Sequence, residues 1–358
     1  MSNVAELLRE LVAINSISSV SNRPVIDFVK TQLSWPVTEF TYRDADGVEK
    51  VNCVFGPCDA RLALVCHTDT VPFDEKLPAR SDGEKVWGRG SCDTKGFLAA
   101  AIGALNSGDT GRNVSLVLTA DEEIGCVGAK HLLARRAISP RFAIVGEPTS
   151  LQPIRAGKGY ALAEVIVAGR EAHSAFPVLG VSAISRAARL IQRIEEFGRE
   201  LEQQTDSSFD PAFTTINIGQ ISGGTAKNII PGECRFLVEW RPIPSQEPRD
   251  VADTLTNIVG DLGFVEVRRA ERGFATPGES RLVELLEKEA GRSAGAVSFG
   301  TEAPQLAALG AETVVFGPGS MSVAHTSGEF APVAELQRCS AILRKVIAEL
   351  VGDNASTK

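Results

Sequence analysis

Five short segments of this chain carry histidine or carboxylate side chains after apolar or glycine-rich stretches. They surround His67, Asp93, the pair Glu122 and Glu123, Glu147, and His325. Imidazole and carboxylate groups without thiolates are typical ligands of zinc and similar divalent cations. Each segment alone has a structural explanation, such as a helix cap or a solvated strand end. Their recurrence at five strand ends, in a chain with four histidines, favours one shared metal site.

The adjacent carboxylates Glu122 and Glu123 suggest a division of labour. One can bind metal and stay ionised, while its neighbour takes a proton from water and later delivers it to a leaving amine. Asp69 follows His67 at a spacing of two residues, so on a strand both side chains face the same side. Asp69 could therefore accept a hydrogen bond from the second imidazole nitrogen of His67. These residues together predict metal-assisted hydrolysis.

The elements that must position these residues alternate between helices and apolar strands. We expect helices near 3–14, 22–34, 97–105 and 127–136, and strands at 48–56, 60–69, 113–123 and 141–149. Buried strands joined by helices indicate an α/β layer with a mostly parallel central sheet flanked by helices. Ligands collect at the carboxyl ends of the strands in such sheets. The candidate ligands lie at those ends.

A second, smaller domain is expected at 159–273. Its order of strand, helix, strand, strand, helix, strand is typical of a ferredoxin-like α+β domain. The α/β pattern then resumes, with helices at 279–290, 302–310 and 334–351 and strands at 297–300 and 312–319. The sequence therefore predicts a first domain formed by 1–158 and 274–358, which the smaller domain interrupts.

The composition is that of an ordinary globular protein, with 43% hydrophobic and 23% charged residues and a net charge of −8. No basic stripe indicates a nucleic-acid surface, and no apolar run reaches membrane-spanning length. The N-terminal segment lacks the pattern of a signal peptide, and the seven cysteines include no CxxC pair. We expect a soluble, cytoplasmic protein that binds neither nucleic acid nor membranes.

The sequence closely resembles a family of cocatalytic zinc metallopeptidases and deacylases. This family includes acetylornithine deacetylase, succinyl-diaminopimelate desuccinylase, aminoacylase-1 and glutamate carboxypeptidase. The matching motifs span nearly the whole chain in order: HTDTVP, GRGSCDTKG, DEEIG, GEPT, GREAHSAFP, GGTAKNIIPGEC and GPGSMSVAHTSGE. The resemblance implies a catalytic domain interrupted by a lid or dimerisation domain.

The resemblance also implies two bound divalent metal ions. Zinc suits the nitrogen and oxygen ligands, and cobalt or manganese could serve instead. The implied ligands are His67 and Glu147 on one ion, Glu123 and His325 on the other, and Asp93 as a bridge between them. Glu122 is then the general base, and Asp69 is the partner of His67. The peptide bond after Asp93 is often cis in such relatives.

Residues of the inserted domain, and Gly300 in the first domain, match functional positions of the family as well. His173, in AHSAFP, matches a histidine that reaches the active site of the partner subunit in a homodimer and stabilises the oxyanion. Asn228 and Arg241 match positions that bind polar groups of the substrate. Gly300 matches a position in a loop that lies beside the substrate. A loop histidine, a turn asparagine and an edge-strand arginine remain alternative interpretations. Glu302 could bind a cation or simply begin a helix.

The substrate is the least defined feature. The segment SFGTEAPQLAALG before GPGSMSVAHTSGEF most resembles the acetylornithine deacetylase branch. We therefore expect a metal-dependent amide hydrolase that removes an N-acyl group, expected to be acetyl, from an amino acid such as ornithine in arginine biosynthesis. N-acetylcitrulline, N-acetyl-lysine, N-succinyl-diaminopimelate and dipeptides remain alternative substrates. Two other functions are possible in principle, that of an aminopeptidase and that of a non-catalytic metal-binding module. The presence of the candidate base and of all five candidate ligands disfavours the non-catalytic module.

Overall fold

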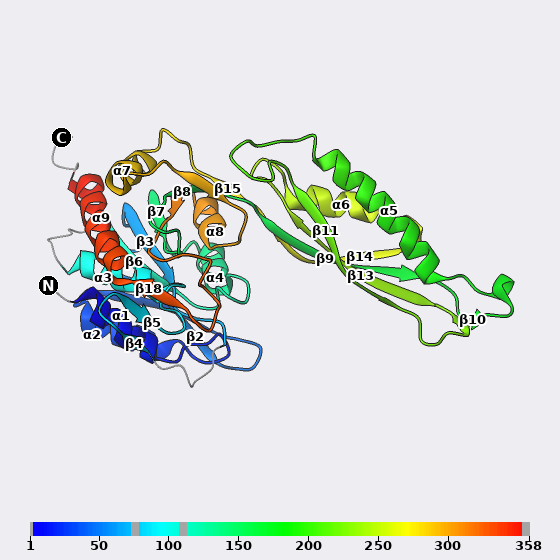
Figure 1. The fold of residues 1–358 in the computed structure, drawn as a ribbon, viewed down its shortest axis with the longest axis horizontal. Helices are drawn as coiled ribbons and strands as arrows, with labels where there is room; N and C mark the ends of the chain where they lie inside the picture. Colours follow the sequence, from blue (N-terminus) through cyan, green and yellow to red (C-terminus); the bar gives the residue numbers. More distant parts are fainter. Residues whose placement is uncertain (1–2, 73–78, 107–112, 353–358) are drawn as a thin grey trace. The chain divides into compact units, whose positions relative to one another are not determined.

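The computed structural model describes residues 3–72, 79–106 and 113–352 (Figure 1). The chain forms two compact units. Unit 1 comprises 1–155, 275–295 and 301–358, and unit 2 comprises 156–274 and 296–300. The segment 296–300, which the sequence division assigned to the first domain, groups with unit 2.

A large mixed sheet forms the centre of unit 1. Within the described residues it has nine strands, in the order β1-β2-β6-β3-β7-β17-β8-β15, with β16 paired to β8. Strands β3, β6, β7 and β17 pair in parallel, whereas β1 and β2 extend the sheet antiparallel. This confirms the predicted α/β class. The strands are β1 (Val37–Arg43), β2 (Glu49–Phe55), β3 (Leu62–His67), β6 (Val114–Thr119), β7 (Phe142–Val145), β8 (Ile154–Gly157), β15 (Phe274–Ala275), β16 (Gly295–Val297) and β17 (Glu312–Val315).

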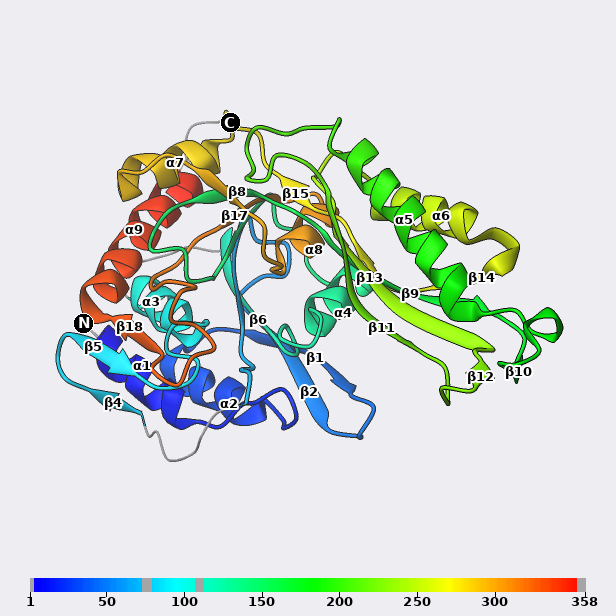
Figure 2. The ribbon, with the colours of Figure 1, turned by 45° about the vertical axis from the view of Figure 1, so that its right-hand side comes forward.

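Helices cover both faces of this sheet, as Figure 2 shows. On one face α3 packs against α1 and α9, and α9 also contacts α7; on the other face α4 contacts α8. Helix α3 is apolar on all sides because it lies between the sheet and its neighbouring helices. The helices are α1 (Val4–Ala13), α2 (Arg23–Gln32), α3 (Lys95–Leu105), α4 (Val127–Arg135), α7 (Arg281–Ala290), α8 (Ala303–Ala308) and α9 (Val333–Gly352).

The register of the parallel strands brings their carboxyl ends to one level. Leu62 of β3 is paired with Val114 of β6 and with Phe142 of β7, and His67 at the end of β3 is paired with Thr119. All residues of these three strands are buried. A buried sheet core therefore presents the segments that follow β3, β6 and β7 at a common edge.

Unit 2 is a four-stranded antiparallel sheet with two helices on one face. The strand order is β11-β13-β9-β14, and α5 and α6 contact this sheet (Figure 1). Alternate residues of β9 and β13 face these helices and form a separate apolar core. The elements are β9 (Tyr160–Ala168), α5 (Ala183–Leu201), β11 (Thr215–Gly223), β13 (Glu233–Arg241), α6 (Pro248–Val259) and β14 (Gly263–Glu271).

Several elements were not predicted. They include β1, an edge strand with little burial, and a small sheet formed by β18, β5 and β4. A strand predicted at 297–300 is instead β16, which ends at Val297.

Among the described helices, none has the length and apolar character needed to cross a bilayer. The remaining short elements are β4 (Arg80–Ser81), β5 (Lys85–Trp87), β10 (Ala172–His173), η2 (Pro177–Leu179), β12 (Ile229–Ile230), η3 (Gly260–Leu262) and β18 (Phe330–Pro332).

Candidate metal centre

The five predicted metal ligands of unit 1 lie together at the common edge of the sheet. His67 Nε2 is 3.0 Å from Asp93 Oδ1. His325 Nε2 is 3.1 Å from Glu123 Oε1 and 3.2 Å from Asp93 Oδ2. The remaining residue, Glu147, has a carboxylate oxygen within 4.8 Å of ligand atoms of His67 and Asp93. Residues that lie far apart in the sequence, from His67 to His325, therefore form one cluster.

The cluster divides into two triads that share Asp93. The first, His67–Asp93–Glu147, is entirely buried, and we call it the buried triad. The second, Asp93–Glu123–His325, contains an imidazole whose side chain is 45% exposed, and we call it the open triad. Each triad could hold one cation, and the two oxygens of Asp93 face the histidines of different triads.

The electrostatics of the cluster fit cations bound at these positions. Burial raises the pKa of Glu147 well above its ordinary value, and that of Glu123 is raised as well. Burial opposes ionisation of Asp93 too, but hydrogen bonds from His325 and His67 hold its pKa well below the usual range. A divalent cation would supply the missing positive charge, and the nitrogen and oxygen donors suit a zinc-like ion.

The neighbouring thiols are not part of the cluster. Cys66 Sγ donates a hydrogen bond to the main-chain oxygen of His67, and Cys92 Sγ donates one to that of Ser320. Burial raises the pKa of both thiols, which disfavours the thiolate form that binds metals. These two cysteines fill space beside the site.

Glu122 follows β6 in a tight turn next to the open triad. Partial burial raises its pKa to about 8, and nearby carboxylates such as Glu302 contribute. The residue before it, Asp121, has a left-handed backbone with φ of 59°. Its side chain accepts a hydrogen bond from Tyr42 at 2.9 Å and pairs with buried Lys50 at 2.9 Å. The turn that carries the candidate base is therefore fixed by a buried ion pair.

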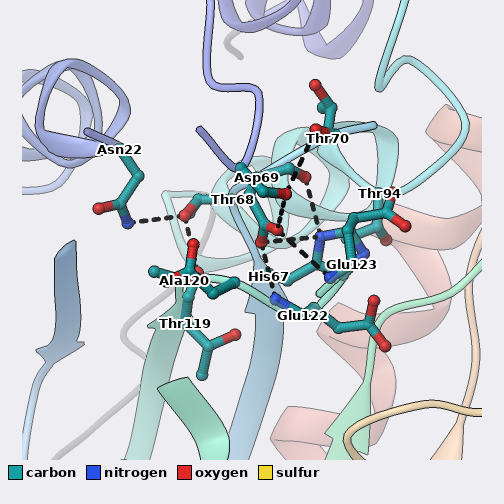
Figure 3. Close-up of polar contacts among 12 residues, drawn as sticks. Asn22, His67, Thr68, Asp69, Thr70, Thr94, Thr119, Ala120, Glu122 and Glu123 are labelled. Atoms are coloured by element: carbon teal, nitrogen blue, oxygen red, sulfur yellow. Dashed lines mark hydrogen bonds and ion pairs between the residues drawn. The ribbon is translucent and has the colours of Figure 1, made fainter. Parts of the chain in front are cut away.

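The structure places the contacts of Asp69 differently from our expectation. His67 Nδ1 lies 3.0 Å from the main-chain oxygen of Asp69 but 3.7 Å from its carboxylate. The carboxylate instead accepts hydrogen bonds from the backbone N–H groups of Glu122 (3.0 Å) and Glu123 (3.3 Å), as Figure 3 shows. The Ser18 hydroxyl donates a third, at 2.7 Å. Asp69 therefore orients the ring through its main chain, and its side chain anchors the Glu122–Glu123 turn.

The segment before Asp93 is held by a residue that sequence reasoning did not single out. The buried carboxylate of Glu329 accepts hydrogen bonds from the backbone N–H groups of Cys92 (3.0 Å) and Asp93 (3.1 Å). Glu329 lies four residues after His325 in the motif GPGSMSVAHTSGE. Its place in this motif was the one feature of the sequence that could have pointed to a functional role. The Asp93–Thr94 peptide bond is cis.

Two of the predicted residues of unit 2 lie close together. His173 is in β10 and Asn228 directly precedes β12, and these two short strands pair with each other. The Ser174 N–H donates a hydrogen bond to the main-chain oxygen of Asn228 at 3.0 Å. His173 is exposed, and its Nδ1 accepts a hydrogen bond from the Ala175 N–H at 3.1 Å.

The other predicted substrate contacts lie elsewhere. Arg241 ends β13, pairs with Glu239 at 2.7 Å and covers the ring of Tyr160. Gly300 is exposed and lies in the segment that groups with unit 2. Glu302, in unit 1, is fully buried, and Thr119 donates a hydrogen bond to one of its oxygens at 2.8 Å. Its other oxygen has no hydrogen-bond partner among the described residues.

Known proteins resemble this chain along nearly its whole length. The model of Peptidase family M20/M25/M40 matches residues 63–349. An acetylornithine deacetylase from Myxococcus xanthus is 46% identical over 367 residues, which cover 96% of this chain and 97% of the relative. Two solved structures share the fold, each over 98% of both chains: a tripeptidase from Staphylococcus aureus (TM-score 0.75, 23% identity) and a dinuclear metal-binding peptidase from Bacillus subtilis (TM-score 0.63, 14% identity).

Proposed function

Because the chain belongs to peptidase family M20/M25/M40 and is therefore a metal-dependent amide hydrolase, we propose that it removes the acetyl group from N-acetylornithine or a closely related N-acyl amino acid. The observation that carries this proposal is the pair of triads sharing Asp93, with a partly buried carboxylate, Glu122, beside them. The similarity to an acetylornithine deacetylase over 96% of the chain supports the choice of acyl amino acid. Such an activity would serve arginine biosynthesis.

The cluster would hold two divalent cations, one in the buried triad and one in the open triad. Bound there, they would act as Lewis acids that lower the pKa of water and polarise an amide carbonyl. Zinc suits the ligand set best, and cobalt or manganese are alternatives. The dinuclear metal-binding peptidase that shares this fold supports two ions rather than one.

Glu122 would transfer the proton during hydrolysis. Its carboxylate would take the proton from the attacking water and deliver it to the nitrogen of the amide as the carbon–nitrogen bond breaks. Burial raises the pKa of Glu122, and cations bound beside it would lower that pKa again and keep the carboxylate ready to accept a proton. Asp69 assists by fixing the backbone of the turn on which Glu122 lies.

We propose a homodimer formed through unit 2, with His173 of one copy stabilising the oxyanion at the site of the other. Exposed apolar side chains beside His173 support such an interface: Phe176, Val178 and Leu179, with Val178 85% exposed. Large exposed apolar groups often mark a protein–protein contact. Asn228, Arg241 and Gly300 would contact the substrate. We place the activity in the cytoplasm because an odd number of cysteines without CxxC pairs fits a reducing compartment.

The test compares the wild-type protein with Glu122→Gln. The variant keeps the shape of the side chain but cannot accept a proton, so we expect normal metal content and a loss of kcat of roughly a hundredfold to ten-thousandfold. Metal content is measured by plasma mass spectrometry. Near-normal turnover with full metal would remove Glu122 as the base.

A substrate panel assigns the acyl group and the amino acid. Wild-type protein loaded with zinc or cobalt is assayed with N-acetylornithine, N-acetylcitrulline, N-acetyl-lysine, N-succinyl-diaminopimelate and dipeptides. We expect the highest kcat/KM with N-acetylornithine, and loss of activity after chelation that zinc or cobalt restores. A preference for dipeptides would indicate a peptidase, and activity on none of the panel would overturn the proposed function.

A further inference from the structure

We propose that Glu329 is a positioning residue that sets the geometry of the shared ligand Asp93 by accepting hydrogen bonds from two consecutive backbone N–H groups. The inference rests on the proposed function, because it requires Asp93 to bind metal. Glu329 belongs to neither triad, since no ligand atom of this residue lies in the clusters formed by the described residues. It would therefore act on the metals through the chain segment that carries Asp93.

The two oxygens of the Glu329 carboxylate have separate partners. Oε1 accepts the hydrogen bonds from both Cys92 N–H and Asp93 N–H. Oε2 accepts one from Arg89 Nη1 at 2.6 Å. Glu329 is only 2% exposed, so water cannot replace these partners readily. Charge-assisted hydrogen bonds of this kind are stronger than neutral ones, and together they fix the direction in which Asp93 leaves the backbone.

The backbone of Glu329 contacts the start of the segment that leads to Asp93, residues 88–93. Its main-chain oxygen accepts a hydrogen bond from the Gly88 N–H at 3.0 Å, and the next residue, Phe330, pairs with Trp87 of β5. Residues 88–93 form the short segment that connects the end of β5 to Asp93. The main chain of Glu329 therefore holds the start of this segment and its side chain holds the end.

The Glu122–Glu123 turn is held in the same manner. There the carboxylate of Asp69 accepts the N–H groups of two consecutive residues, Glu122 and Glu123. Both acceptors are buried carboxylates outside the two triads, and each one holds a segment with at least one candidate ligand. The repetition of this contact at two unrelated segments indicates that it positions ligands, in addition to stabilising a turn.

The experiment uses full-length Glu329→Gln and a matched control, Glu287→Gln. Glu287 also accepts a backbone N–H, from Ala294 at 2.6 Å, but that loop carries none of the candidate ligands. An amide offers only one oxygen, so the side chain of the Glu329→Gln variant cannot serve both the two N–H groups and Arg89. We expect the zinc affinity of Glu329→Gln, measured by competition with a chromophoric chelator, to fall roughly tenfold to a hundredfold. The control should bind zinc as the wild type does.

Two further readouts separate positioning from simple stabilisation. The absorption spectrum of the cobalt-loaded protein reports ligand geometry, so it should change in Glu329→Gln and stay unchanged in Glu287→Gln. The thermal midpoint of metal-free Glu329→Gln should fall as well, whereas that of Glu287→Gln should stay near the wild-type value, because one amide oxygen still accepts the Ala294 N–H. Wild-type zinc affinity and cobalt spectrum in Glu329→Gln, with only a lower midpoint, would overturn the inference.

A second variant covers the case in which Glu329→Gln does not fold. Glu329→Asp keeps the charge but is one methylene shorter, so it cannot reach the N–H groups and Arg89 together. We expect lower zinc affinity and an altered cobalt spectrum; wild-type values for both would overturn the inference. Failure of the wild-type protein itself to bind two ions would instead overturn the proposed function.

Discussion

The buried triad and the open triad share Asp93 but meet solvent very differently. His67 and Glu147 are 2% and 4% exposed, whereas the side chain of His325 is 45% exposed. A carboxylate that is buried without a counter-ion costs free energy, and the carboxylates of both triads are largely buried, with the Glu123 side chain 8% exposed. The two triads therefore differ mainly in their imidazoles, of which only that of His325 reaches solvent. We infer that the buried triad binds its ion more tightly and that the open triad is the side that water and substrate reach.

The difference in exposure follows from the elements that carry the candidate ligands. His67 ends β3 and Glu147 follows β7, two adjacent strands in the middle of the sheet. His325 lies instead in a loop after β17 and has a left-handed backbone with φ of 59°. A strand end is fixed by the sheet, whereas a loop position depends on its own local contacts. The comparison predicts that substitutions in the two triads have unequal effects.

The largest effect is expected for Asp93→Asn, because Asp93 belongs to both triads. The amide lacks the negative charge that two cations share, so we expect loss of both ions under dialysis. Activity should fall at least about a thousandfold, since metal catalysis contributes several kcal/mol. Plasma mass spectrometry and kcat/KM measure the two effects. Retention of two metal equivalents by this variant would show that Asp93 is no bridge and would remove the link between the triads.

The next largest effect is expected when one triad loses its histidine and the other stays intact. In His67→Asn the buried triad loses its imidazole, and in His325→Asn the open triad does. We expect His325→Asn to retain about one metal equivalent after mild chelation, held by the buried triad, and His67→Asn to retain less because its loss leaves buried carboxylates without a cation. Timed chelator exchange of the wild type should show two phases. Equal retention in both variants would contradict the comparison.

The sequence located the candidate ligands because the fold imposes a simple rule on them. Parallel strands end at a common edge, so apolar runs that end in His67, Glu123 or Glu147 could be assigned to one place before the structure was known. The family predicted from the motifs is confirmed as well. The edge strand β1 was missed because its residues 37–43 are mostly half-buried or exposed and lack a clear alternation.

The contacts that orient the candidate ligands could not be predicted in the same way. Asp69 and Glu329 act on backbone N–H groups, and every residue except proline has such a group. The spacing of His67 and Asp69 is compatible with a side-chain contact or with a main-chain contact, and the structure has the second. Tertiary hydrogen bonds to the main chain leave no pattern in residue types, so three-dimensional positions are needed to find them.

The smallest effect is expected for Asp69→Asn, because this substitution acts on the open triad alone. Asp69 accepts the N–H groups of Glu122 and Glu123, and Glu123 belongs only to the open triad. An asparagine turned to serve the Glu122 N–H would place its amide group against the Glu123 N–H or the Ser18 hydroxyl. We therefore expect the zinc ion of the open triad to bind roughly tenfold more weakly and kcat to fall by a similar factor, while the zinc ion of the buried triad, the first to bind, is unaffected.

Ser18→Ala is the matched control for this prediction. It removes the 2.7 Å hydrogen bond to Asp69 but keeps the carboxylate, so it should change kcat only a few-fold, which corresponds to about 1 kcal/mol. Isothermal titration with zinc resolves the two ions. A weaker first ion in Asp69→Asn would mean that Asp69 acts mainly on His67 through its main chain, and the two triads would then depend on the same support.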